Sequence, residues 1–170
     1  MEISTVIISA ILIVVCLGGL YLFTYFKDKK ERESPAPASN SKDLLPLQLQ
    51  AYERLVILAD RIALPNLVSR VNQSGVSAKE MQALLTKIIK QEFDHNITQQ
   101  IYVSPGAWEA ISNLKEQNIL IINQVSSFLP ENASGIELNK GLMTLLMENP
   151  KASLHTIVSE ALSYEAKKLM

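Results

Sequence analysis

The pattern of apolar and polar positions divides the chain into three parts. Residues 3–26 include 18 apolar residues and no charge, residues 27–43 are charged and rich in serine and proline, and residues 44–170 mix apolar and polar positions. The 24 residues of the first part form about 36 Å of helix, which exceeds the roughly 30 Å hydrocarbon core of a bilayer. We therefore predict a transmembrane helix at 3–26, a flexible linker at 27–43 and a folded domain at 44–170.

Apolar residues in the domain recur at the period of an α-helix. Helices are predicted over 47–62, 77–101, 104–129, 134–148 and from Pro150 onward, with at most a short helix over 66–72. Capping boxes are expected to begin two of them, and an apolar second face on 47–62 predicts a central helix packed between neighbours. The boxes pair Ser77 with Glu80 and Ser134 with Glu137, and the second face contains Leu49, Val56 and Ile57. The fold class is all-α, a bundle of about five helices.

The charges that flank the apolar segment predict its orientation. Lys27, Lys29, Lys30 and Arg32 follow the segment, whereas Glu2 precedes it. The positive-inside rule then places the domain in the cytoplasm. A cleaved signal peptide is disfavoured because its basic start and small-residue cleavage site are missing. Homo-oligomerisation is left open by the glycine pair in the span.

Composition excludes several classes of function. The 16 basic and 17 acidic side chains provide no basic field for nucleic acid. The single cysteine, Cys16, excludes a disulfide framework and a structural zinc site, and it falls in the predicted span. Neither a glycine-rich phosphate loop nor the spacing of a nucleophile and its base is present. The sequence therefore predicts no catalytic residue, metal or cofactor.

Polar residues on the apolar face of the 77–101 helix form the one candidate site. Glu92 and Asn96 fall inside the apolar arc, and Gln100 follows at the next four-residue step. A buried carboxylate needs a cation, so we expect Glu92 to pair with Arg54 or Arg61 in a buried polar seam that fixes helix register. The candidate seam consists of Arg54, Arg61, Glu92, His95, Asn96 and Gln100.

The alternative interpretation is an enzyme or metal protein that uses Glu92 and His95. A Glu-x-x-His step places two ligands on one helix face, as in di-iron carboxylate bundles. Those bundles need a second such step, but the other histidine, His155, is preceded three residues earlier by Ala152. The pattern therefore supplies half of a di-iron site.

Two blocks and one tryptophan carry a family resemblance. The blocks are LPLQLQAYERL at 45–55 and QEFDHNITQQIY at 91–102, followed by Trp108. From the span to about Trp108 the chain resembles an uncharacterised family of small single-span inner-membrane proteins of Bacteroidota with a cytoplasmic helical domain. The resemblance implies a bacterial inner-membrane setting and no catalytic activity. It falls on a set of residues that includes most of the seam, namely Tyr52, Arg54, Glu92, His95, Asn96 and Gln100. We expect a membrane-tethered interaction or scaffold module that binds the bilayer through 3–26 and a protein partner through its domain.

Overall fold

The described part of the chain is helical throughout. The computed structural model describes residues 41–71, 73–148 and 154–170. The predicted transmembrane helix at 3–26 and the predicted linker as far as residue 40 lie outside the described residues. Within them there is no strand, and no helix combines the length and apolar character needed to cross a bilayer. The elements are α2 (Ser41–Ile62), α3 (Leu64–Val71), α4 (Ala78–His95), η1 (Ile97–Ile101), α5 (Pro105–Ser127), α6 (Gly135–Glu148) and α7 (His155–Leu169).

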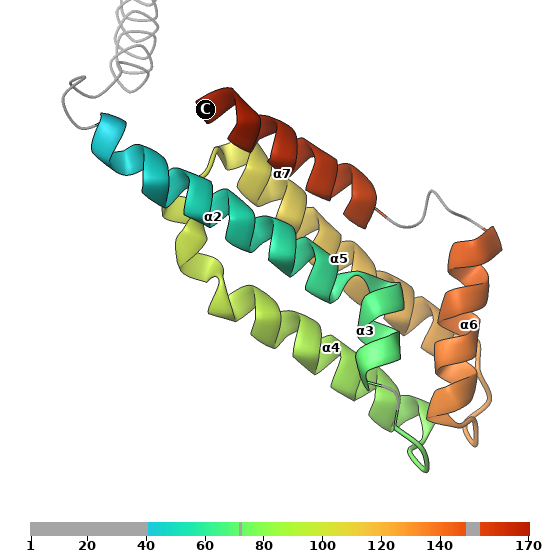
Figure 1. Ribbon diagram of the computed structural model, residues 1–170. Helices are drawn as coiled ribbons and strands as arrows, with labels where there is room; N and C mark the ends of the chain where they lie inside the picture. Colours follow the sequence, from blue (N-terminus) through green and yellow to red (C-terminus); the bar gives the residue numbers. More distant parts are fainter. Residues whose placement is uncertain (1–40, 72, 149–153) are drawn as a thin grey trace, which may run out of the picture. The chain divides into compact units, whose positions relative to one another are not determined.

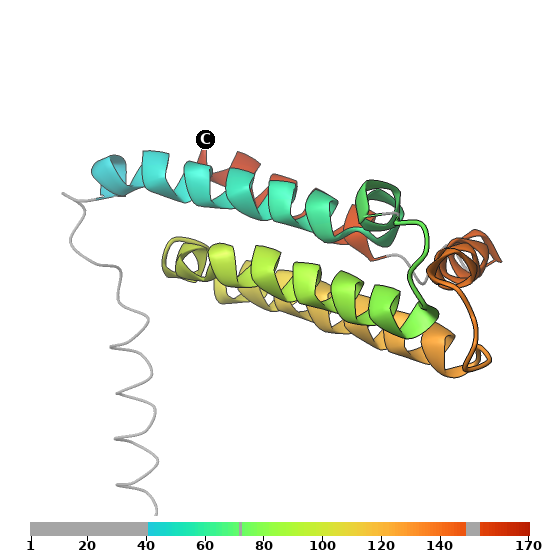
Figure 2. The ribbon, with the colours of Figure 1, turned by 90° about the horizontal axis from the view of Figure 1, so that it is seen from below.

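The helices of the compact unit Lys42–Met170 lie in two layers. Figure 2 shows α2 and α7 in one layer and α4 and α5 side by side in the other. Helices α3 and α6 lie together at one end of these layers (Figure 1). Large side chains from both layers are almost fully buried between them, which makes this interface the core. They include Leu55, Leu58, Ile62, Met81, Leu85, Ile89, Ile111, Leu114, Ile122 and Leu162.

The two predicted capping boxes are confirmed, and the structure joins them. Ser77 and Ser134 each cap a helix, and their side-chain oxygens accept from the backbone N–H of the glutamate three residues later. In return, the backbone N–H of each serine donates to the carboxylate of that glutamate. The chain segments that contain them pair as an isolated antiparallel bridge, which fixes the start of α4 against the start of α6. The close approach requires Gly135, because a Cβ there would lie 2.9 Å from Val76 Cγ2.

The structure differs from the sequence prediction in the number and limits of the helices. Residues 64–71 form a complete helix, so the described residues contain six α-helices where about five were predicted. Helix α2 begins at Ser41, inside the predicted 27–43 linker, and it includes Pro46, which has no N–H to donate to the carbonyl four residues earlier. The predicted 77–101 helix divides at Asn96 into α4 and η1.

The prediction that the first helix is central is wrong. Helix α2 lies in one of the two layers, and its second apolar face is only partly covered. Ile57 is 51 % exposed on that face. An apolar side chain therefore remains open to solvent next to the polar residues of α2.

Candidate functional site

A groove between α2 and α4 gathers five of the six residues of the predicted seam. It encloses about 280 Å³. The lining residues of each helix are three or four positions apart and therefore share one helix face. The α2–α4 groove is lined by Arg54, Ile57, Leu58, Arg61, Glu92, His95 and Asn96.

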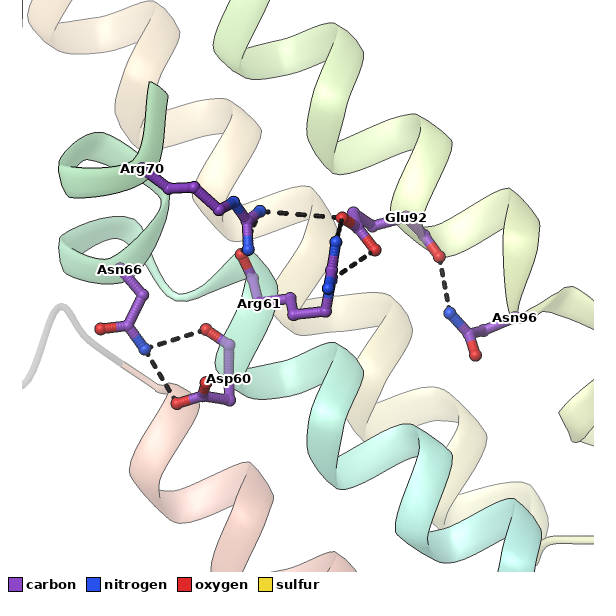
Figure 3. Close-up of polar contacts among 6 residues, drawn as sticks. All are labelled: Asp60, Arg61, Asn66, Arg70, Glu92 and Asn96. Atoms are coloured by element: carbon purple, nitrogen blue, oxygen red, sulfur yellow. Dashed lines mark hydrogen bonds and ion pairs between the residues drawn. The ribbon is translucent and has the colours of Figure 1, made fainter. Parts of the chain in front are cut away.

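Glu92 is held at this groove by two arginines (Figure 3). Arg61 donates through Nε to Glu92 Oε2 at 2.9 Å and through Nη2 to Oε1 at 2.5 Å, which makes a bidentate pair. Arg70 of α3 places its Nη2 3.7 Å from the same Oε1. The Glu92 side chain is 16 % exposed and that of Arg61 48 %, and the hydrogen bond to Glu92 raises the pKa of the Arg61 guanidinium. The carboxylate is thus covered by cations whose outer edges remain in water.

The corner between α2 and α3 positions the second arginine. Asn66 Nδ2 donates to the backbone oxygen of Asp60 at 3.1 Å and to its Oδ1 at 2.8 Å. Arg70 Nη2 donates to the backbone oxygen of Arg61 at 3.2 Å. These bonds fix α3 against the end of α2, so that Arg70 reaches Glu92 from a third helix (Figure 3).

The remaining residues of the predicted seam differ from its continuous, buried arrangement. Asn96 is buried, but its Nδ2 donates to the Glu92 backbone oxygen at 2.9 Å, so it satisfies the last turn of α4. Arg54, His95 and Gln100 are exposed. Gln100 lies beyond the end of α4 in η1, where the change to three residues per turn moves it off the apolar face. Arg61, and not Arg54, is the cation that pairs with Glu92.

The α2–α4 groove presents charged side chains in fixed positions. Both residues of the Glu-x-x-His step line the groove, but Glu92 engages the arginines and His95 is exposed. Across the described ranges, no three His, Cys, Asp or Glu side chains lie close enough to hold a metal ion. Arg54 and His95 have no ion pair in this part of the chain. The groove therefore offers the guanidinium of Arg54, which has no ion pair within the described residues, beside the exposed Ile57.

A second polar cluster was missed by the sequence analysis. Glu165 Oε2 of α7 accepts from Tyr52 Oη at 2.7 Å and from Ser104 Oγ at 2.5 Å. The Ser104 backbone N–H donates to Tyr52 Oη at 3.1 Å, and Ser104 Oγ accepts from the Ala107 N–H at 3.0 Å. The cluster therefore ties α2 and α7 to the first turn of α5.

Two groups of this cluster have shifted pKa values. Hydrogen bonds from Ser104 and then Tyr52 lower the pKa of Glu165. Burial, as the largest cause, raises the pKa of Tyr52. The cap at Ser104 was readable from the Ser104-Pro105 pair, but no local signal at Glu165 indicates that its carboxylate meets this cap.

Comparison with known proteins adds a family without a known activity. The model of a family of unknown function (DUF7935) matches residues 1–169. No curated protein and no solved structure matches the chain significantly.

Proposed function

For this chain, which belongs to the DUF7935 family of unknown function, we propose the role of a membrane-tethered α-helical interaction module. Its domain holds a protein partner near the membrane through the α2–α4 groove. The setting is the inner membrane of a bacterium, of the Bacteroidota by resemblance, with one span at 3–26 and the domain in the cytoplasm. The scaffold activity consists of keeping the partner at that surface.

The sequence of the amino-terminal segment supports the tether. Residues 3–26 carry no charge, and their Ile, Leu, Val and Phe side chains each favour insertion by about 0.3–0.6 kcal/mol near the bilayer centre. Basic residues begin at Lys27, and such clusters stay on the cytoplasmic side. The linker that follows keeps the domain within reach of the membrane surface.

The uncompensated positive charge of the α2–α4 groove is the observation that carries the partner proposal. The carboxylate of Glu92 is already neutralised by Arg61 and Arg70. Arg54 and His95 line the same groove, and neither makes an ion pair within the described ranges. Ile57, 51 % exposed, lines the groove one helical turn from Arg54. The complementary partner is a protein segment that presents a carboxylate next to an apolar side chain.

Each part of this pattern has a separate task in recognition. A carboxylate of the partner would pair with Arg54, which presents a planar, bidentate donor. The apolar side chain would cover Ile57 and remove it from water, which supplies affinity in proportion to the area buried. The Arg61–Glu92 pair fixes the wall of the groove, so that little ordering is required on binding.

Crosslinking and purification from membranes tests the proposal. We expect the full chain to recover a defined partner, and a chain that lacks residues 43–170 to lose it. Reversal of charge by Arg54→Glu should abolish recovery, because it places a carboxylate against the carboxylate of the partner. The control is Lys140→Glu, a reversal of equal size on the exposed face of α6. Recovery of the same proteins without residues 43–170, or equal losses for the two reversals, would refute the proposal.

A further inference from the structure

A second and larger groove lies on the other side of α4, along its contact with α5. One segment has a volume of about 610 Å³ and continues into another of about 520 Å³, the two sharing Lys79, Gln82 and Asn123. Lys90 is two residues before Glu92, so these side chains leave α4 in nearly opposite directions. The α4–α5 groove, lined also by Lys87 and Thr86, is therefore separate from the α2–α4 groove.

The charge of this groove is unbalanced. Lys79, Lys87 and Lys90 line the larger segment, which no Asp or Glu lines, and the single acidic residue of the groove, Glu131, lines the smaller segment. None of the three lysines forms an ion pair within the described residues, and this includes Lys90 with Asp94, one turn further along α4. Three cations without ion pairs in the described part of the chain therefore lie together in one groove, although the whole chain has nearly balanced charge, with 17 acidic and 16 basic side chains.

The polar groups of the groove also favour an anion. Gln82 Nε2 donates to Asn123 Oδ1 at 2.9 Å, and Ser126 Oγ donates to Gln82 Oε1 at 2.9 Å. These bonds occupy the two amide oxygens and leave the Asn123 amide nitrogen as a donor. Thr86 Oγ1 is enclosed and has no hydrogen-bond partner in the described part of the chain. Thr86 also lines the groove, so it is the nearest hydroxyl there without a hydrogen bond of its own among the described residues.

We propose that the α4–α5 groove binds a phosphate group, with Lys87 and Lys90 as its principal ligands. Residues three apart on a helix have Cβ atoms roughly 5–6 Å apart, so both ammonium groups can reach the oxygens of one phosphate. Lys79 lies eight residues before Lys87, about 12 Å along the helix axis. It therefore contacts a different part of the ligand, together with the amide of Asn123.

Two sources present this chemistry, the headgroup of an anionic phospholipid and a soluble phosphate ester. Lysine footprinting on the full chain separates them. The chain is reconstituted in phosphatidylcholine vesicles, with and without inorganic pyrophosphate, and in vesicles that contain phosphatidylglycerol. An amine-reactive reagent then modifies accessible lysines, and mass spectrometry gives the modification rate at each position.

The inference predicts that Lys87 and Lys90 are protected at least threefold, while the exposed Lys140 of α6 reacts at an unchanged rate. Protection by pyrophosphate identifies a soluble phosphate as sufficient, and protection by phosphatidylglycerol alone identifies the lipid headgroup. No protection in either arm, or equal protection of Lys140, would overturn the inference.

Affinity measurements with paired variants give an independent check. The double change Lys87→Gln and Lys90→Gln should weaken binding by roughly 25-fold, for whichever ligand gives protection, since each lysine contributes about fivefold. Lys140→Gln should leave the affinity within about twofold. Lys87, Lys90 and Lys140 are exposed, so none of these changes should disturb the core. A melting temperature equal to that of the unchanged protein verifies that each variant is folded. An equal loss for both variants would indicate nonspecific charge attraction and would refute the site.

Discussion

Removal of the Arg61–Glu92 pair is the most direct perturbation of the α2–α4 groove. The bidentate bonds of 2.9 and 2.5 Å make this the best-formed ion pair among the described residues. Exposed pairs contribute about 0.2–1 kcal/mol. The 16 % exposure of Glu92 raises the expected coupling toward the upper end of that range and the 48 % exposure of Arg61 limits it, so we expect about 1 kcal/mol.

The assay is a double-mutant cycle on the free energy of unfolding of residues 42–170. It compares Arg61→Ala, Glu92→Ala and the double variant, with Arg54 and Glu92 as the control cycle. Glu92→Ala should cost more than Arg61→Ala, because Arg70, 3.7 Å from the carboxylate, partly replaces Arg61. For a unit of this size, about 1 kcal/mol corresponds to roughly 3–6 °C in melting temperature.

High salt should reduce the measured coupling, since both arginines reach solvent. The control cycle should give a coupling energy below about 0.3 kcal/mol. Additive losses for Arg61 and Glu92, or a larger coupling for Arg54, would show that the groove is not organised by this pair.

Three further predictions concern stability. Glu165→Gln should lower the melting temperature at pH 7, and the difference should shrink as the pH falls below about 4.5. The pKa of Glu165 is lower in the folded protein than in the unfolded chain, so its carboxylate stabilises the fold above the ordinary carboxyl pKa, and this stabilisation is lost as the pH falls through the lowered pKa. A difference that stays constant to pH 3 would contradict this. Gly135→Ala should cost about 1–3 kcal/mol through overpacking, whereas Gly106→Ala, whose Cβ would have its nearest neighbour at 3.8 Å, should not destabilise; equal urea midpoints would refute the packing argument. Asn118→Leu should cost about 1–3 kcal/mol in urea unfolding, because Asn118 Nδ2 donates to the Ile62 backbone oxygen at 2.7 Å, and a loss under about 0.5 kcal/mol would argue against that bond.

The sequence predicted helix starts correctly where the capping partners lie within one turn of each other along the chain. Ser77 and Glu80 form their capping box within one turn, so four residues sufficed to predict it. Residues 119–122, with the sequence Ile-Leu-Ile-Ile, would by themselves suit a β-strand. They lie inside α5 because the surrounding helical period outweighs this local preference.

Long-range features were predicted only in part. Asn96 is buried, as its position inside the apolar arc predicted, but its side chain bonds to the Glu92 backbone at the end of α4 and not to a side chain of a facing helix. Arg70 entered the site through α3, whose apolar spacing indicates a helix with one buried face but does not indicate which helix that face packs against. Glu165 met the Ser104 cap from 61 residues away, and such a contact depends on tertiary packing alone. The sequence could therefore indicate Glu92 and its two candidate arginines but not the third helix that completes the pair.

Site-specific photo-crosslinking tests the central proposal, that the α2–α4 groove binds a protein partner. A photoreactive amino acid replaces Ile57 in the full chain, and a matched replacement is made at Ile157, which is 61 % exposed on α7. We predict one discrete adduct from position 57, absent from position 157 and lost with Arg54→Glu. Adducts that are equal at both positions, or that survive Arg54→Glu unchanged, would contradict the proposal.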